Sequence, residues 1–238
     1  MPSNPLRSID ALVLCGGLGT RLAKAVKDRP KPMAEIEGRP FLDLIIDYLH
    51  QNGVRRFILC SGYKSEFIEQ YYKDTPDSDR SYLMSVEQTP LGTGGAVKNA
   101  EALIQSDPFL ALNGDSFCNV PLDGFFDFFK EKNAALSAAL TRIDDAGDYG
   151  SITLSADREI TSFDEKSAKG AGWVNAGIYL FSKAALGQIE PGKKLSLEYD
   201  IFPKFAENGM YGFVVEEPLY DIGTPERLEA ARKYFSEK

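Results

Sequence analysis

In the first half of the chain, segments whose apolar residues are spaced as in strands alternate with segments whose apolar residues are spaced as in helices. This pattern predicts strands separated by helices. Short apolar or alternating runs predict strands at 9–14, 57–60, 82–87 and 109–112. Apolar positions at helical spacing predict the intervening helices at 41–50, 63–72 and 96–104. Strands that alternate with helices in this way form a parallel sheet with helices on both faces. We therefore predict an α/β fold.

The second half has a different pattern, in which strands outnumber helices. After a phenylalanine-rich helix at 121–132, strands are expected at 134–141, 149–154, 160–163, 173–181 and 211–215. Polar turns between several of them favour antiparallel pairing, so we expect a mixed, mostly parallel sheet. Helices are expected at 201–207 and after Thr224, which with Pro225 makes a favourable helix start. Residues 1–238 are predicted to form one domain, with a first half over about 1–133 and a second over about 134–238.

Composition narrows the classes of protein that fit. The net charge of −8 argues against binding nucleic acid or an anionic membrane surface. Cys15, Cys60 and Cys118 each lie in or beside an apolar run and form no Cys-x-x-Cys pair, so neither a disulfide nor a zinc site is expected. Residues 1–7 resemble no signal peptide, and no run is long enough to span a membrane. We expect a soluble cytoplasmic protein, and a homo-oligomer is compatible with this sequence.

The most informative stretch is a glycine-rich turn followed by basic residues. Gly16, Gly17 and Gly19 come directly after the first predicted strand, so backbone N–H groups can approach a ligand closely. The basic residues behind them reverse the overall charge locally: Arg21, Lys24, Lys27, Arg29 and Lys31. Backbone donors beside clustered cations suit a polyphosphate. The glycines alone would equally fit a tight turn with a solvated basic loop, because the spacing matches neither a Walker loop nor a dinucleotide fingerprint.

The whole string, Gly-Gly-Leu-Gly-Thr-Arg-Leu followed by Pro30-Lys31-Pro32, resembles the sugar-1-phosphate nucleotidyltransferases. The resemblance implies a Rossmann-like three-layer fold that joins a nucleoside monophosphate from a nucleoside triphosphate to a sugar 1-phosphate and releases pyrophosphate. It also implies that the first half binds the nucleotide and the second half the sugar phosphate. By the same resemblance, Arg21 and Lys31 act on the phosphates. The residues expected to contact the nucleotide in this loop are Leu14, Gly16, Gly17, Gly19 and Thr20.

Two further segments of the resemblance concern the base and a metal ion. Gln88 and Gly92 match positions that contact the nucleobase, although a glycine-built corner between a strand and a helix would explain them equally well. Asp115 ends the fourth strand after Gly114, where ligands of α/β sheets bind. The resemblance makes Asp115 and Asp221 the ligands of Mg²⁺ and Gly114 a nucleotide contact. Carboxylates and phosphates suit this hard cation.

The second half carries the residues expected to bind the sugar phosphate. By resemblance, the backbone at Gly150 contacts the sugar, Glu165 and Asn175 bind its hydroxyl groups, and Lys166 binds its phosphate. Glu198 is a further expected contact. Without the resemblance, Glu165 and Lys166 would be interpreted as an exposed charged turn.

Within the family, several short sequence motifs of this chain, taken together, are most similar to those of the D-glycero-α-D-manno-heptose 1-phosphate guanylyltransferases. These enzymes use GTP and make GDP-heptose for surface polysaccharides. Mannose 1-phosphate guanylyltransferases and uridylyl- or thymidylyltransferases share most of these strings and remain alternatives. A non-catalytic regulatory subunit of the same fold would be expected to lose charged site residues, which this chain retains. A glycosyltransferase is disfavoured, since it would have no need of the loop that carries Arg21 and Lys31.

Overall fold

The computed structural model describes residues 4–17, 28–75, 77–144, 149–163 and 170–237. Within these residues, one large mixed sheet runs in the order β10-β9-β11-β6-β1-β4-β5, and β8 joins it by pairing with both β11 and β12. Its strands are β1 (Asp10–Leu14), β4 (Arg56–Ser61), β5 (Ser81–Val86), β6 (Phe109–Asn113), β8 (Leu136–Ile143), β9 (Ile152–Leu154), β10 (Ile160–Phe163), β11 (Gly172–Phe181) and β12 (Met210–Val215).

The first half of the chain forms the parallel part of the sheet, as the sequence predicts. β1 lies between β4 and β6 and pairs in parallel with both, and β5 extends the same arrangement beyond β4. Helices α1 (Phe41–Gln51), α2 (Ser65–Asp74) and α3 (Gly92–Asn99) make the crossover connections. The carboxyl ends of these strands therefore share one edge of the sheet, where ligands of such sheets bind.

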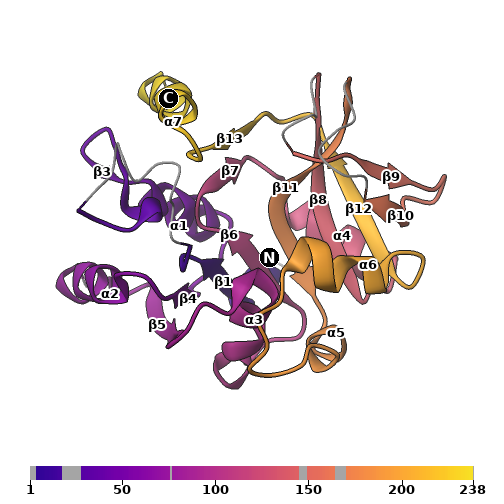
Figure 1. Cartoon of the computed structure of the whole chain (residues 1–238), viewed down its shortest axis with the longest axis horizontal. Coiled ribbons are helices and arrows are strands. Elements are labelled where there is room, and N and C mark those ends of the chain that lie inside the picture. The colour runs from indigo at the N-terminus through magenta and orange to yellow at the C-terminus, as the bar shows by residue number, and fades with distance from the viewer. Residues whose placement is uncertain (1–3, 18–27, 76, 145–148, 164–169, 238) are drawn as a thin grey trace.

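Strand β11 joins the two halves and introduces the antiparallel pairing. It pairs antiparallel with β6 on one side and with β8 on the other, while β12 returns parallel to β8. β9 and β10 form an antiparallel pair beyond it. The long strand, shown in Figure 1 between the two groups of ribbons, brings the second half against the end of β6.

Helices cover both faces of the sheet, giving the predicted three layers (Figure 1). Successive strand residues face opposite ways: Ala11 and Val13 belong to one hydrophobic core and Leu12 to the other. The first core packs against α1, α2, α4 (Leu122–Glu131) and α7 (Pro225–Ser236), and the second against α3, α5 (Lys183–Gly187) and α6 (Phe202–Phe205). All three cysteines are buried and free. Within the described residues, no helix has the length and apolar character needed to cross a bilayer.

Two predicted helices begin or run differently from the expectation. The helix expected at 96–104 starts four residues earlier as α3, and its last part is a 3₁₀ turn, Glu101–Leu103. The helix expected at 201–207 is shorter, because the π-helical segment Leu197–Ile201 precedes α6. In both places, tertiary contacts override local propensity: the N–H groups of Gly94 and Gly95 donate to Leu195 O, so the α3 glycines form a packed first turn.

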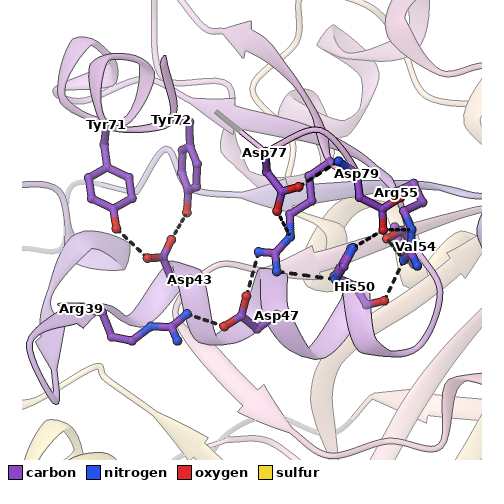
Figure 2. A network of polar contacts seen from close by, with 11 residues as sticks. Arg39, Asp43, Asp47, His50, Val54, Arg55, Tyr71, Tyr72, Asp77 and Asp79 are labelled. Atoms are coloured by element: carbon purple, nitrogen blue, oxygen red, sulfur yellow. Dashed lines mark hydrogen bonds and ion pairs between the residues drawn. The ribbon is translucent and has the colours of Figure 1, made fainter. Parts of the chain in front are cut away.

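A polar network holds α1 against α2 and the loop that precedes β5 (Figure 2). The hydroxyl groups of Tyr71 and Tyr72 both donate to Asp43, at 2.6 and 2.8 Å. His50, the only histidine, lies 2.9 Å from Asp79 through Nε2. The network contains none of the residues predicted for the catalytic or binding site, so His50 at the end of α1 helps to hold that helix against the loop before β5.

Candidate active site

The two aspartates predicted to hold a metal ion lie next to each other, although they are 106 residues apart in the chain. Asp221 ends β13 (Leu219–Asp221), which pairs antiparallel with β7 (Ser116–Cys118) and brings Asp221 opposite Ser116. Ile222 N donates to Asp115 O at 3.0 Å, which ties the two segments together. This small sheet lies beside the end of β6 (Figure 1), at the predicted edge.

Lys31 is the third predicted residue at this place. It begins the 3₁₀ turn Lys31–Met33, and its Nζ lies 2.5 Å from Asp115 Oδ2. Only 13% of its side chain is exposed, so the ammonium group is held inside the site. A Cβ at Gly223 would lie 2.7 Å from Asp221 Oδ1 and 3.8 Å from Lys31 Nζ. Lys31, Asp115 and Asp221 therefore surround one place, whereas Arg21 falls outside the described residues.

The Asp221 carboxylate accepts hydrogen bonds from groups that were not predicted from the sequence. Gly223 N donates to its Oδ1 at 2.8 Å, and the Tyr149 hydroxyl donates to its Oδ2 at 2.5 Å. Arg227 Nη1 approaches the same carboxylate to 3.2 Å, with the guanidinium carbon 4.8 Å from the centre of the Tyr149 ring. An arginine in the first turn of a helix was the available signal for Arg227, because that position disfavours cations.

The first glycine segment packs closely against neighbouring backbone. Gly114 N donates to Leu14 O at 3.0 Å, and a Cβ on Gly114 would come within 2.7 Å of that oxygen. A Cβ at Gly16 would lie 3.0 Å from Glu87 Oε1, whereas Gly17 is exposed with open space around it. Gly19 and Thr20 lie outside the described residues. Leu14, Gly16, Gly17 and Gly114 are therefore grouped at the ends of β1 and β6.

Glu87 is the residue of this region that sequence reasoning missed. Its carboxylate lies beside Gly16 and Gly62, with Oε1 2.7 Å from where a Cβ on Gly62 would be. Leu91 N donates to its other oxygen at 3.0 Å. Burial raises the pKa of Glu87, and the hydrogen bond from Leu91 N opposes the shift only in part. Within the described residues no cation pairs with this half-buried carboxylate, so it is a strong acceptor for a ligand.

Gln88, the neighbouring residue, was the predicted base contact. It is exposed in a bend two residues beyond the end of β5, and no contact among the described residues places it near the glycine segment. Since Glu87 faces Gly16, the geometry favours Glu87 over Gln88 for a contact with a nucleotide bound there. The sequence places both residues just before the second glycine-rich turn and does not choose between them.

Gly92, the other predicted base contact, begins α3 with φ of +70°, and a Cβ there would lie 2.6 Å from Leu195 O.

We expect Gly92→Ala to lower the free energy of unfolding by on the order of 2 kcal/mol, because the left-handed backbone and the contact with a carbonyl both disfavour a side chain. Urea denaturation measures this. Gly187→Ala in α5 is the matched control, since its Cβ meets nothing within 4 Å; equal losses in both variants would contradict the explanation.

Asn175 and Glu198, predicted to bind the sugar, are connected through a buried tyrosine. Asn175 Nδ2 lies 2.7 Å from the Tyr179 hydroxyl, and its Oδ1 accepts from Gly177 N at 2.9 Å. Glu198 Oε2 accepts from Ser196 Oγ at 2.8 Å. Burial raises the pKa of Tyr179 well above its usual range, and the charges of Glu198 and then Asp115 add to this. The sugar-side residues therefore lie in the same electrostatic neighbourhood as Asp115.

The remaining sugar-side predictions are described only in part. Gly150 has φ of +78°, a conformation that favours glycine, and directly follows Tyr149. Glu165 and Lys166 lie outside the described residues. Tyr149 and Gly150 therefore connect the Asp221 carboxylate to the side of the site where the sugar is expected.

The comparisons with known proteins identify the family. The model of the nucleotidyl transferase family matches residues 10–238. The chain belongs to this nucleotidyl transferase family. Two nucleotidyl transferases with similar sequences are D-glycero-alpha-D-manno-heptose 1-phosphate guanylyltransferases. The protein from Campylobacter jejuni is 35% identical over 92% of this chain and 96% of its own length, and that from Aneurinibacillus thermoaerophilus is 36% identical over 94% and 97%.

Solved structures of a protein with a similar sequence agree with this fold. HddC from Yersinia pseudotuberculosis is 36% identical to this chain. The two structures match over 95% of this chain and 99% of HddC, with a TM-score of 0.85. The structure of HddC complexed with GMP-PN has a TM-score of 0.84. The chain is thus a nucleotidyltransferase enzyme with the mixed, mostly parallel sheet and helical layers predicted from the sequence.

Proposed function

We propose that this nucleotidyltransferase transfers the guanylyl group of GTP to D-glycero-α-D-manno-heptose 1-phosphate and releases pyrophosphate, with Mg²⁺ as cofactor. The observation that carries the proposal is the convergence of Lys31, Asp115 and Asp221 beside the glycine segment at the ends of β1 and β6. The names of the two bacterial relatives, each similar over more than nine-tenths of this chain, support the choice of substrates. We expect the reaction to occur in the cytoplasm and to supply surface polysaccharide assembly.

The chemistry requires two anions to meet. An oxygen of the sugar phosphate forms a bond to the α-phosphorus, and the bond from that phosphorus to the bridging oxygen breaks as pyrophosphate leaves with the electron pair. Positioning and charge neutralisation are the main requirements of such a transfer. Gly16, Gly17 and Gly19 are predicted to donate backbone N–H groups to the triphosphate, and Thr20 to contact the nucleotide. Arg21 is predicted to neutralise the departing pyrophosphate. Lys31 is predicted to hold the phosphates near the reacting centre.

The donor set at Asp115 and Asp221 suits Mg²⁺. This ion is usually bound through one or two carboxylates together with substrate phosphates, and the described residues hold no larger cluster of His, Cys, Asp and Glu that would form a complete protein cage. When bound there, Mg²⁺ would neutralise charge that develops on the α-phosphate. The two carboxylates would hold it, and Lys31 would share its charge between Asp115 and the phosphates.

The position of Glu87 supports the proposed preference for guanine. Guanine presents N1–H and its 2-amino group side by side, and an ionised carboxylate can accept one hydrogen bond from each. Uracil and thymine place carbonyl oxygens on both sides of N3–H, which would face the same carboxylate and be repelled. The HddC structure complexed with GMP-PN, a guanine nucleotide analogue by its name, belongs to a protein 36% identical to this chain.

Pyrophosphate release with a panel of substrates tests the proposed function. GTP, ATP, UTP and dTTP are each combined with heptose, mannose and glucose 1-phosphates in the presence of Mg²⁺. The highest kcat/KM is expected for GTP with D-glycero-α-D-manno-heptose 1-phosphate, and none without a divalent ion. Preference for mannose 1-phosphate would favour the alternative guanylyltransferase, preference for UTP or dTTP would contradict Glu87 as a guanine contact, and no turnover would favour a regulatory subunit.

A further inference from the structure

Arg227 occupies a position where a cation is disfavoured. It is the third residue of α7, and its backbone N–H donates to the side chain of the capping residue Thr224 at 3.3 Å. Unpaired N–H groups and the helix dipole make this end of a helix attractive to anions and repulsive to cations. A favourable contact elsewhere must therefore hold the guanidinium group.

One such contact is the carboxylate of Asp221. Arg227 Nη1 lies 3.2 Å from Asp221 Oδ2 and 3.4 Å from Oδ1, and the guanidinium group lies over the Tyr149 ring. The two charged side chains are mostly enclosed, with 27% of Arg227 and 14% of Asp221 exposed. Arg227 is therefore a structured part of the site, on the side of Tyr149 and Gly150.

Each carboxylate predicted to bind the metal thus already has a cation as its partner. Lys31 pairs with Asp115, and Arg227 with Asp221. The two cations approach the same place: a Cβ at Gly223 would lie 3.8 Å from Lys31 Nζ and 3.9 Å from Arg227 Nη1. A divalent ion bound by both aspartates would add two further positive charges and so weaken the pairing of Lys31 with Asp115 and of Arg227 with Asp221.

We propose that Arg227 is a second phosphate-binding residue, which leaves Asp221 when the metal binds and pairs with the phosphate of the sugar 1-phosphate. This inference rests on the proposed function. The planar guanidinium group offers two parallel N–H donors that match phosphate oxygens. Its position against Tyr149, beside Gly150, favours the sugar phosphate over the triphosphate, which is expected near the glycine segment and Lys31.

Two measurements on the Arg227→Gln variant test the proposal: metal binding is expected to become tighter, and sugar phosphate binding weaker. Mn²⁺ binding to the free protein, followed by electron paramagnetic resonance, is expected to tighten severalfold, because Asp221 loses its competing cation. The KM for the sugar 1-phosphate is expected to rise about tenfold or more, while the KM for GTP stays within about twofold. Arg227→Lys is expected to retain the wild-type Mn²⁺ affinity but to lose part of the sugar phosphate affinity.

Arg232→Gln is the matched control, since Arg232 lies on the same helix and contacts Glu229 and the Glu35 carbonyl oxygen. It is expected to leave both readouts unchanged. Unchanged Mn²⁺ affinity in Arg227→Gln, an unchanged KM for the sugar phosphate, or an equal rise in the KM for GTP would each overturn the role of Arg227. Absence of turnover in the wild-type panel would overturn the proposed function instead, and the Mn²⁺ comparison would still decide whether Arg227 competes for Asp221.

Discussion

Asp221→Asn is expected to lower kcat by about 10²- to 10³-fold while the protein stays folded. An amide removes the negative charge that is predicted to hold Mg²⁺ against the α-phosphate, and such charge stabilisation is worth several kcal/mol in a transition state, or about tenfold for each 1.4 kcal/mol. The amide oxygen can still accept the hydrogen bond from Gly223 N, and the amide nitrogen can donate one to the Tyr149 hydroxyl oxygen, so both neighbours keep a partner. Pyrophosphate release under saturating GTP and sugar phosphate measures the effect.

The control is Asp127→Asn, which changes an exposed aspartate on α4 in the same way. It is expected to keep wild-type turnover. Circular dichroism and thermal unfolding establish that both variants are folded. If Asp221→Asn kept near wild-type activity at every Mg²⁺ concentration, the metal role of Asp221 would be wrong.

Glu87→Gln is expected to lower kcat/KM for GTP by about 100-fold and to change the order of preferred bases. A glutamine side chain has a single acceptor and presents N–H donors where guanine also donates, so one guanine group loses its partner. ITP lacks the 2-amino group, so the ratio of kcat/KM between GTP and ITP is expected to shrink. Activity with UTP or dTTP is expected to rise relative to GTP.

The variant's stability separates this effect from misfolding. Burial raises the pKa of Glu87 in the folded protein, so the folded state binds its proton more tightly than the unfolded state does. Ionisation therefore costs stability as the pH rises through that raised pKa. Glu87→Gln should raise Tm at pH 8 relative to the wild type, with the gain disappearing below the ordinary glutamate pKa.

If Gln88→Ala, and not Glu87→Gln, changed the base preference, the sequence-based prediction for Gln88 would be right.

Local patterns predicted much of this fold. The four parallel strands of the first half, the antiparallel pairing of the second and the capped start of α7 at Thr224 were all expected from periodicity and capping residues. The helix at 201–207 was predicted too long: α6 covers only Phe202–Phe205, and the π-helical segment Leu197–Ile201, tied to α3 through Thr93, precedes it.

The residues of the candidate site also fall into two groups: those that the sequence could name and those that only the structure revealed. Lys31, Asp115 and Asp221 belong to motifs that are contiguous in sequence, so they could be named before their geometry was known. The roles suggested for Glu87 and Arg227 depend on distances between segments far apart in the chain, which no local pattern contains. Glu87 matters because its carboxylate meets Gly16 and Gly62, and Arg227 because it reaches back to Asp221.

By itself, the sequence determined the α/β class, the glycine segment and the acidic residues at strand ends, because spacing and residue type control backbone conformation and ligand chemistry locally. Only the tertiary structure decided that β13 pairs with β7, and hence that Asp115 and Asp221 meet with one cation on each. The physical reason is that electrostatic interactions act through space, and the pairing of two short strands sets which charges become neighbours.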